Sequence, residues 1–170
     1  MFMILQKCSL WKVLEIFFIE PTKSHFVKEI SKKIKLAPTS VKKHLSNLVE
    51  MGFIDPVKGD LYVGYKAKRE NTEFIFYKKI SNLIQLKKSK LLEKLKEKYP
   101  SSIILFGSYD KGEDIESSDI DIFINSKKFK LSLENYEKAL NRVIHLIFKN
   151  EATPRLMKSI NNGTIIFGER

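Results

Sequence analysis

One short stretch of the sequence constrains the fold more than any other part of the chain. Its first part, Ser102–Phe106, is a run of β-branched and apolar residues that predicts a strand. Its last part, Asp119–Ile124, alternates strictly, so that Asp119 and Asp121 share one face while isoleucines occupy the other. The polar residues between the two parts indicate a loop or a short helix. The stretch therefore predicts two strands joined by a polar segment.

The residues at the ends of these strands suggest a site for a metal-bound nucleotide. Gly107 lets backbone amides approach an anion, and Ser108 adds a hydroxyl donor. Two carboxylates on one strand face, Asp119 and Asp121, repel each other unless a cation lies between them. Carboxylate oxygens suit Mg²⁺, which is usually held by one or two such groups together with phosphate oxygens. The sequence therefore predicts a site for Mg²⁺ and a nucleotide.

The same stretch resembles the signature of the DNA polymerase β nucleotidyltransferase superfamily, in which Gly-Ser is followed by Asp-x-Asp. It is most similar to the minimal nucleotidyltransferase branch, whose members resemble "LFGSYxxGE…SDID". The resemblance implies a small α/β domain with a short mixed sheet. It also implies that Gly107 and Ser108 hold phosphates and that Asp119 and Asp121 hold Mg²⁺. The implied reaction is attack of a hydroxyl on the α-phosphate, with pyrophosphate leaving.

The resemblance further implies a third catalytic carboxylate on a later strand, and here the sequence departs from the family. Leu133–Leu140 predicts a helix and Arg142–Phe148 a strand, on which His145 stands at the aspartate position. His145 could be a metal ligand or general base, or Glu113 or Glu151 could supply the carboxylate. Alternatively, the site binds Mg-nucleotide without transfer, and His145 is then a packed strand residue. Because imidazole is a poor Mg²⁺ ligand, we favour impaired or absent transfer, and whether the protein is an enzyme stays open.

The positive charge of the chain is confined to its first part. Residues 1–98 contain 21 Lys and Arg against 10 Asp and Glu, whereas residues 99–170 contain 10 of each, so the net charge of +11 belongs to the first part. Such asymmetry indicates two modules, of which the basic one faces a polyanion.

Three helices are predicted in this basic part. Leu10–Ile19 is dominated by apolar residues and predicts a buried helix. Apolar residues at every fourth position from Phe26 to Ile34 predict a short amphipathic helix. Pro38 suits the first turn of a third helix, which Gly52 ends in a left-handed conformation.

A hairpin follows these helices, because residues 53–65 predict a strand, a turn at Lys58–Asp60 and a second strand. The order resembles that of a winged helix-turn-helix over roughly residues 8–66. The resemblance implies that residues 39–47 form a recognition helix that binds double-stranded DNA. Protein docking is the alternative for this module. The implied DNA-contacting residues are Thr39, Ser40, Lys42, Lys43, Ser46 and Asn47.

Few other residues indicate a site. A single cysteine, Cys8, excludes an internal disulfide framework, and we expect it to pack in the core. His25 and His44 have no ligand-type residue at suitable spacing, so we expect packing or surface histidines. The uninterrupted apolar runs near the N-terminus, among them Ile16–Ile19, are each too short to cross a membrane. We expect neither a membrane span nor a signal peptide, and a cytoplasmic location.

Residues 71–99 lack glycine and proline and predict one or two connecting helices. Their apolar stripe includes Phe76, Ile80 and Leu91, with a polar stretch over residues 85–90. We expect the stripe to pack on one or both domains, with homodimerisation along it as the alternative.

The predicted fold class is α+β. It has a winged helix at residues 1–69, a helical connector at 70–98 and a nucleotidyltransferase-like domain at 99–170. The predicted function is that of a DNA-binding transcriptional regulator with a Mg-nucleotide-binding domain and impaired or atypical transferase activity. The alternative is an active Mg-dependent nucleotidyltransferase that moves NMP from NTP to a protein or small-molecule hydroxyl, as antitoxin-like or modifying enzymes do.

Overall fold

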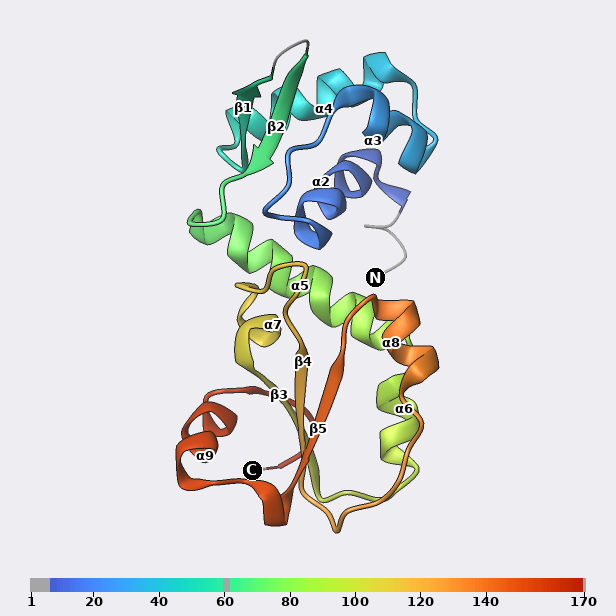
Figure 1. Cartoon of the computed structure of the whole chain (residues 1–170), viewed down its shortest axis with the longest axis vertical. Helices are drawn as coiled ribbons and strands as arrows, with labels where there is room; N and C mark the ends of the chain where they lie inside the picture. The colour runs from blue at the N-terminus through green and yellow to red at the C-terminus, as the bar shows by residue number, and fades with distance from the viewer. Residues whose placement is uncertain (1–6, 60–61, 170) are drawn as a thin grey trace. The chain divides into compact units, whose positions relative to one another are not determined.

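The computed structural model describes residues 7–59 and 62–169. The chain divides into two compact units, Met1–Lys78 and Lys79–Arg170, whose helices and strands are drawn in Figure 1. The division falls within helix α5 (Thr72–Lys88), inside the predicted connector. Within the described ranges, no helix has both the length and the apolar character needed to cross a bilayer.

The first unit has the element order of a winged helix. In the described part of this unit, helices α2, α3 and α4 precede an antiparallel two-stranded sheet, and an isolated β-bridge joins His25 to Tyr65 of β2. Pro38 occupies the first turn of its helix, as predicted, and the last residue of the predicted turn, Asp60, lies outside the described residues. The elements are α2 (Ser9–Ile19), α3 (Val27–Ile34), α4 (Pro38–Glu50), β1 (Ile54–Lys58) and β2 (Val63–Ala67).

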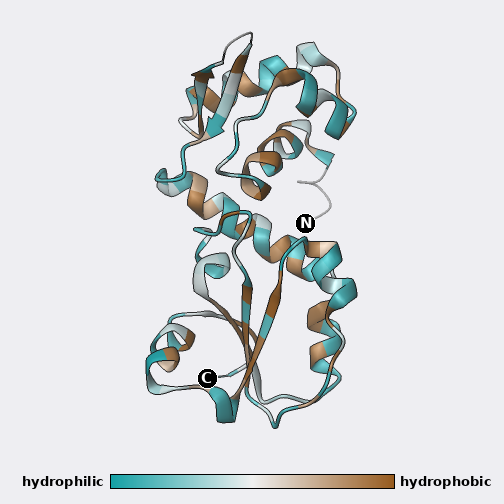
Figure 2. Cartoon of the chain, viewed as in Figure 1, coloured by the Kyte–Doolittle hydropathy of each residue, from teal (hydrophilic) through white to brown (hydrophobic). Residues whose placement is uncertain are grey.

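Helix α2 forms the centre of this unit. In Figure 2 its turns are mostly brown, because apolar residues occur on nearly every side of the helix. Helices α3 and α4 each contribute one apolar face and leave their lysines exposed to solvent. The buried side chains of the three helices are Trp11, Val13, Leu14, Ile16, Phe17, Phe18, Ile30, Val41, Leu45 and Leu48.

Three packing predictions for this unit are wrong. Cys8 is exposed, because it precedes α2 as its N-cap and lies outside the apolar stripe. Phe26 precedes α3 and is 38% exposed; its ring lies beside Gly64 of the wing, where a Cβ would be 3.2 Å from it. Phe76 of α5 is 57% exposed, and Phe74 is the buried aromatic residue of that turn.

His25 is a buried packing residue, as expected, but the expectation that no carboxylate stands near it is wrong. Its Nδ1 lies 3.4 Å from Oε1 of Glu29, one helical turn further on, and its Nε2 contacts the carbonyl oxygen of Glu20. One carboxylate oxygen of Glu20 also lies within 4.8 Å of the ligand atoms of His25 and Glu29. Because Lys23 and Lys33 already bind the Glu20 carboxylate, this cluster is an ion-pair network that joins α2 to α3.

The second unit contains a short mixed sheet, as predicted. Its strand order is β5-β4-β3-β6, in which β4 and β5 are parallel and the other pairs are antiparallel. The strands are β3 (Ser102–Phe106), β4 (Ile120–Ile124), β5 (Ile144–Phe148) and β6 (Thr164–Gly168). The helices are the end of α5, α6 (Leu91–Lys96), α7 (Gly107–Lys111), α8 (Glu134–Leu140), the 3-10 helix η1 (Lys149–Glu151) and α9 (Pro154–Asn161).

The two faces of this sheet have separate cores. One core contains Ile103 and Leu105 of β3 together with the isoleucines of β4 at positions 120, 122 and 124, packed against α5 and α6. The other contains Ile104, Phe106 and Phe123, packed against Ile160 of α9. Figure 1 shows α6 and α9 on opposite sides of the sheet. Because side chains alternate along a strand, residue 121 points to the same face as residue 123, the α9 face.

Candidate functional site

The structure brings together the three residues predicted to be catalytic. In the parallel ladder of β4 and β5, Asp121 lies directly opposite His145, and Asp119 immediately precedes β4. His145 Nδ1 lies 3.5 Å from Oδ1 of Asp121 and 3.7 Å from Oδ2 of Asp119. The imidazole thus contacts both carboxylates through one nitrogen atom.

Gly107 is placed where β3 ends and α7 begins, next to Asp121. Its backbone has φ +81°, a left-handed conformation that favours glycine. A Cβ at this position would lie 2.6 Å from Oδ2 of Asp121. The glycine therefore leaves room for the aspartate carboxylate, a role that the sequence did not indicate. Ser108 follows in the first turn of α7 and is half-buried.

The charges in the cluster are not balanced. Burial raises the pKa of Asp121, the neighbouring His145 lowers it, and the negative charge of Asp119 raises it again, so that the pKa lies above its usual value. A carboxylate with a raised pKa carries a negative charge that its surroundings do not fully compensate. A cation bound beside Asp121 would supply that compensation.

Two of the interpretations of the missing carboxylate do not fit the structure. Glu151 accepts hydrogen bonds from Lys128 Nζ at 2.6 Å and from the backbone N–H of Phe148. Phe148 lies at the far end of the β4–β5 ladder from Asp121, so Glu151 is remote from the cluster. His145 is not a packed strand residue, since its side chain is 52% exposed.

A buried polar network, which the sequence did not reveal, positions the segment that leads into β4. Asn82 of α5 donates hydrogen bonds from Nδ2 to the carbonyl oxygen of Tyr109 and to Oδ1 of Asp114. Asp114 Oδ2 lies 3.6 Å from Nη2 of Arg142, just before β5. Asp114 is 1% exposed and Asn82 6%. Because buried polar groups need partners, the network ties together α5 and the two segments that carry Asp119 and His145.

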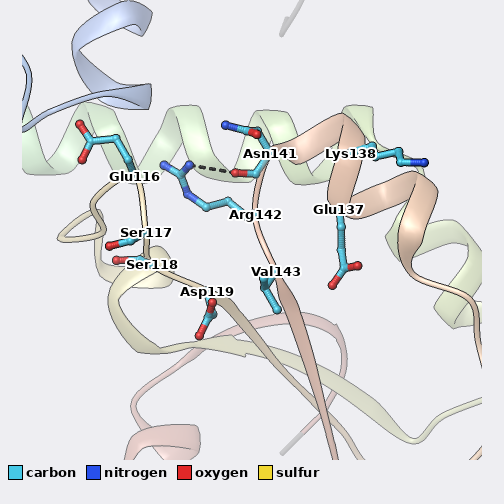
Figure 3. A pocket seen from close by; sticks show the side chains of 9 residues that line it. All are labelled: Glu116, Ser117, Ser118, Asp119, Glu137, Lys138, Asn141, Arg142 and Val143. Carbon is cyan, nitrogen blue, oxygen red and sulfur yellow. Dashed lines mark hydrogen bonds between the residues drawn. The ribbon is translucent and has the colours of Figure 1, made fainter.

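A pocket of about 400 Å³ opens beside Asp119, as Figure 3 shows. The segment before β4 forms one wall, and the end of α8 with the segment before β5 forms the other. Its lining residues are Glu116, Ser117, Ser118, Asp119, Glu137, Lys138, Asn141, Arg142 and Val143. Since β4 lies between β5 and β3, the pocket lies on the β5 side of the cluster, away from Gly107.

The three side chains are of the kinds that bind divalent cations, but their ligand atoms do not all lie within 4.8 Å of one another, as those of Glu20, His25 and Glu29 do. Asp119 and Asp121 project from one face of the sheet, are 42% and 29% exposed, and offer carboxylate oxygens to solvent. His145 adds an imidazole nitrogen beside both. Carboxylates and imidazole are the usual protein ligands of divalent ions.

The residues predicted to contact DNA lie on the side of α4 that faces away from the core. Thr39, Lys42, Lys43 and Ser46 are exposed, and Ser40 and Asn47 are partly exposed. The opposite side of α4 is buried in the core. His44 is not on the exposed side, because it shares a hydrogen bond with Ser9 Oγ.

Two family models match the chain, one within each of its two units. The family model of the nucleotidyltransferase domain matches residues 88–166, and that of the bacterial regulatory proteins of the arsR family matches residues 13–55. A protein of Methanocaldococcus jannaschii named "putative protein adenylyltransferase" is 42% identical over 81 residues, which cover 43% of this chain and 83% of the relative. The chain belongs to the nucleotidyltransferase domain family. A second protein of that organism with the same name is 38% identical over 81 residues, covering 42% and 81% of the two chains.

The matched nucleotidyltransferase region contains all five residues predicted for the metal and nucleotide site, Gly107, Ser108, Asp119, Asp121 and His145. The matched arsR region contains the whole of α3 and α4. No solved structure matches this chain significantly. The chain thus combines a helix-turn-helix region of regulatory type with a nucleotidyltransferase domain.

Proposed function

We propose that this protein is a DNA-binding transcriptional regulator whose nucleotidyltransferase domain binds a divalent metal–nucleotide complex and transfers nucleotide poorly with Mg²⁺. The observation that carries the proposal is the position of His145, directly opposite Asp121 on the neighbouring strand. An imidazole stands where the resemblance implies a third carboxylate. A cytoplasmic location follows from the proposed ligands, duplex DNA and nucleoside triphosphate.

In the proposed complex, Asp119 and Asp121 hold the cation, and the Gly107 amide and the Ser108 hydroxyl face the phosphates. A bound divalent cation neutralises charge on the phosphates and on the reacting oxygens. Two carboxylates alone favour Mg²⁺, as the sequence indicated. The imidazole of His145 contributes no negative charge in its neutral form, so a Mg²⁺ ion that activates the attacking hydroxyl is held less firmly than by a third aspartate. Weak transfer with Mg²⁺ follows.

Active transfer to a protein hydroxyl is the second candidate function. Two observations favour it: the relatives are named protein adenylyltransferases, and the open pocket beside Asp119 lies on the His145 side of the cluster. An acceptor side chain in that pocket would approach the cluster from the side opposite Gly107. His145, half exposed next to Asp121, would then act as the general base.

One set of measurements separates the two candidates. We expect calorimetric titration to show that ATP or CTP binds with Mg²⁺ present and that Asp121→Asn abolishes the binding. With labelled ATP or CTP and a lysate of the source cells, we expect little label on any protein. Rapid labelling with Mg²⁺ that is lost in Asp121→Asn would establish the active transferase instead. If no nucleotide binds with any divalent cation, both candidates are wrong.

The DNA-binding proposal rests on the exposed cations of α4. In Lys42→Glu/Lys43→Glu, two positive charges of the proposed phosphate-contacting face become negative. We expect loss of duplex affinity and a decrease in the slope of log affinity against log salt of about 2, since each phosphate contact contributes about 0.9. Lys87→Glu/Lys88→Glu at the exposed end of α5 changes the net charge equally and serves as the control. Equal loss in both variants would mean that binding depends only on net charge and that α4 is not the recognition helix.

A further inference from the structure

The proposed metal site has donors of two different kinds. Asp119 and Asp121 offer hard carboxylate oxygens, whereas His145 offers an imidazole nitrogen that is 3.5 Å from one carboxylate and 3.7 Å from the other. Mg²⁺ prefers oxygen donors and seldom accepts imidazole, whereas Mn²⁺, Co²⁺ and Zn²⁺ accept both kinds. The exchange of a carboxylate for an imidazole therefore changes which ion the site selects.

The distances let His145 share an ion with either carboxylate. Its Nδ1 lies 3.5 Å from Oδ1 of Asp121 and 3.7 Å from Oδ2 of Asp119. Two donors that bind one ion at about 2.1 Å lie at most about 4.2 Å apart, and both observed distances are shorter than that.

The fold holds His145 in this position independently of any ion. The parallel ladder sets its backbone opposite Asp121. The β5 segment is anchored at its start by Arg142, which is paired with the buried Asp114, and by Glu137, which accepts a hydrogen bond from the backbone N–H of Ile144. Such fixation of a ligand by surrounding groups raises metal affinity.

We infer that Asp119, Asp121 and His145 form a mixed oxygen and nitrogen site that selects a divalent transition-metal ion of the Mn²⁺ and Co²⁺ class over Mg²⁺. The inference rests on the proposed metal–nucleotide function and names its ion. His145 is in this view a metal ligand, and the weak transfer expected with Mg²⁺ is a consequence of ion choice.

The test uses the full chain and titrates Co²⁺, followed by its visible absorption, and Mg²⁺, followed by competition. Most protein sites bind Co²⁺ more tightly than Mg²⁺, so the informative quantity is the change caused by substitution. In His145→Ala we expect the Co²⁺ affinity to fall on the order of tenfold or more while the Mg²⁺ affinity hardly changes. In His145→Asp we expect the Mg²⁺ affinity to rise and the preference for Co²⁺ to fall. With Mn²⁺, electron spin echo spectroscopy should detect an imidazole nitrogen in the wild type and not in His145→Asp.

The controls address other ligands of the chain. All variants carry Cys8→Ser, because an exposed thiol binds soft ions. Glu29→Gln alters the Glu20–His25–Glu29 cluster and should leave Co²⁺ binding unchanged.

The outcomes distinguish this inference from the proposed function. Equal losses of Co²⁺ and Mg²⁺ affinity in His145→Ala would assign His145 a structural role and overturn the inference, as would an unchanged Co²⁺ affinity. If ATP still binds in a manner that depends on Asp121, the proposed function survives such a result. If neither a metal nor ATP binds to the wild type, both are overturned.

Discussion

Replacement of Gly107 by alanine tests whether this glycine serves the metal site. The added Cβ would lie 2.6 Å from Oδ2 of Asp121, whereas a relaxed contact is about 3.5 Å, so the carboxylate must move by about 0.9 Å. The left-handed backbone, at φ +81°, adds about 1–2 kcal/mol of strain for a residue with a Cβ. We expect Gly107→Ala to lower the free energy of unfolding by about 1–3 kcal/mol and the affinity for Mn²⁺ or Co²⁺ on the order of 10–100-fold.

The assay combines urea unfolding with metal titration and uses Gly52→Ala as the matched control. Gly52 has φ +70°, but a Cβ there would make only an ordinary contact of 3.5 Å with Asn71. The control therefore has the same backbone strain without displacement of a carboxylate, and its metal affinity should equal that of the wild type. If Gly107→Ala binds metal like the wild type, or if Gly52→Ala loses as much affinity, Gly107 does not act through Asp121.

Two further predictions concern stability. Hydrogen bonds from its two lysine partners lower the pKa of Glu20 to about 2, so its stabilising effect is complete above its ordinary pKa of 4.5 and is lost as the pH falls through about 2. In pH-dependent unfolding, Glu20→Gln should thus cost about 1 kcal/mol at neutral pH and progressively less as the pH falls through about 2, and a difference that does not depend on pH would refute this. Asn82→Ala removes the two hydrogen bonds that Oδ1 of the buried Asp114 and the carbonyl of Tyr109 accept from Nδ2. It should cost about 1–3 kcal/mol in urea unfolding, whereas a loss below about 0.5 kcal/mol, the effect of a surface substitution, would contradict the assigned network.

The sequence pattern was sufficient to predict where these strands and helices lie, because their formation depends on the local geometry of the backbone. The period of two in Asp119–Ile124 and the apolar run of Ser102–Phe106 predicted β4 and β3 to within a residue. Pro38 and Gly52 marked the two ends of α4, since each acts through its own backbone conformation. The wrong predictions for Cys8, Phe26 and Phe76 concern burial, which depends on what packs against an element as well as on its period.

The sequence by itself determined that a strand carrying Asp119 and Asp121 follows a Gly-Ser turn and that His145 lies on a later strand. Only the tertiary structure decided that His145 is in register with Asp121, that Glu151 is held at the other end of the ladder, and that Gly107 makes room for a carboxylate. The physical reason is that strand pairing brings together residues that are far apart in the chain, as it does Phe106 with Asp121 and Asp121 with His145. A local pattern specifies which face a side chain occupies, and the register of the sheet specifies which side chain it meets.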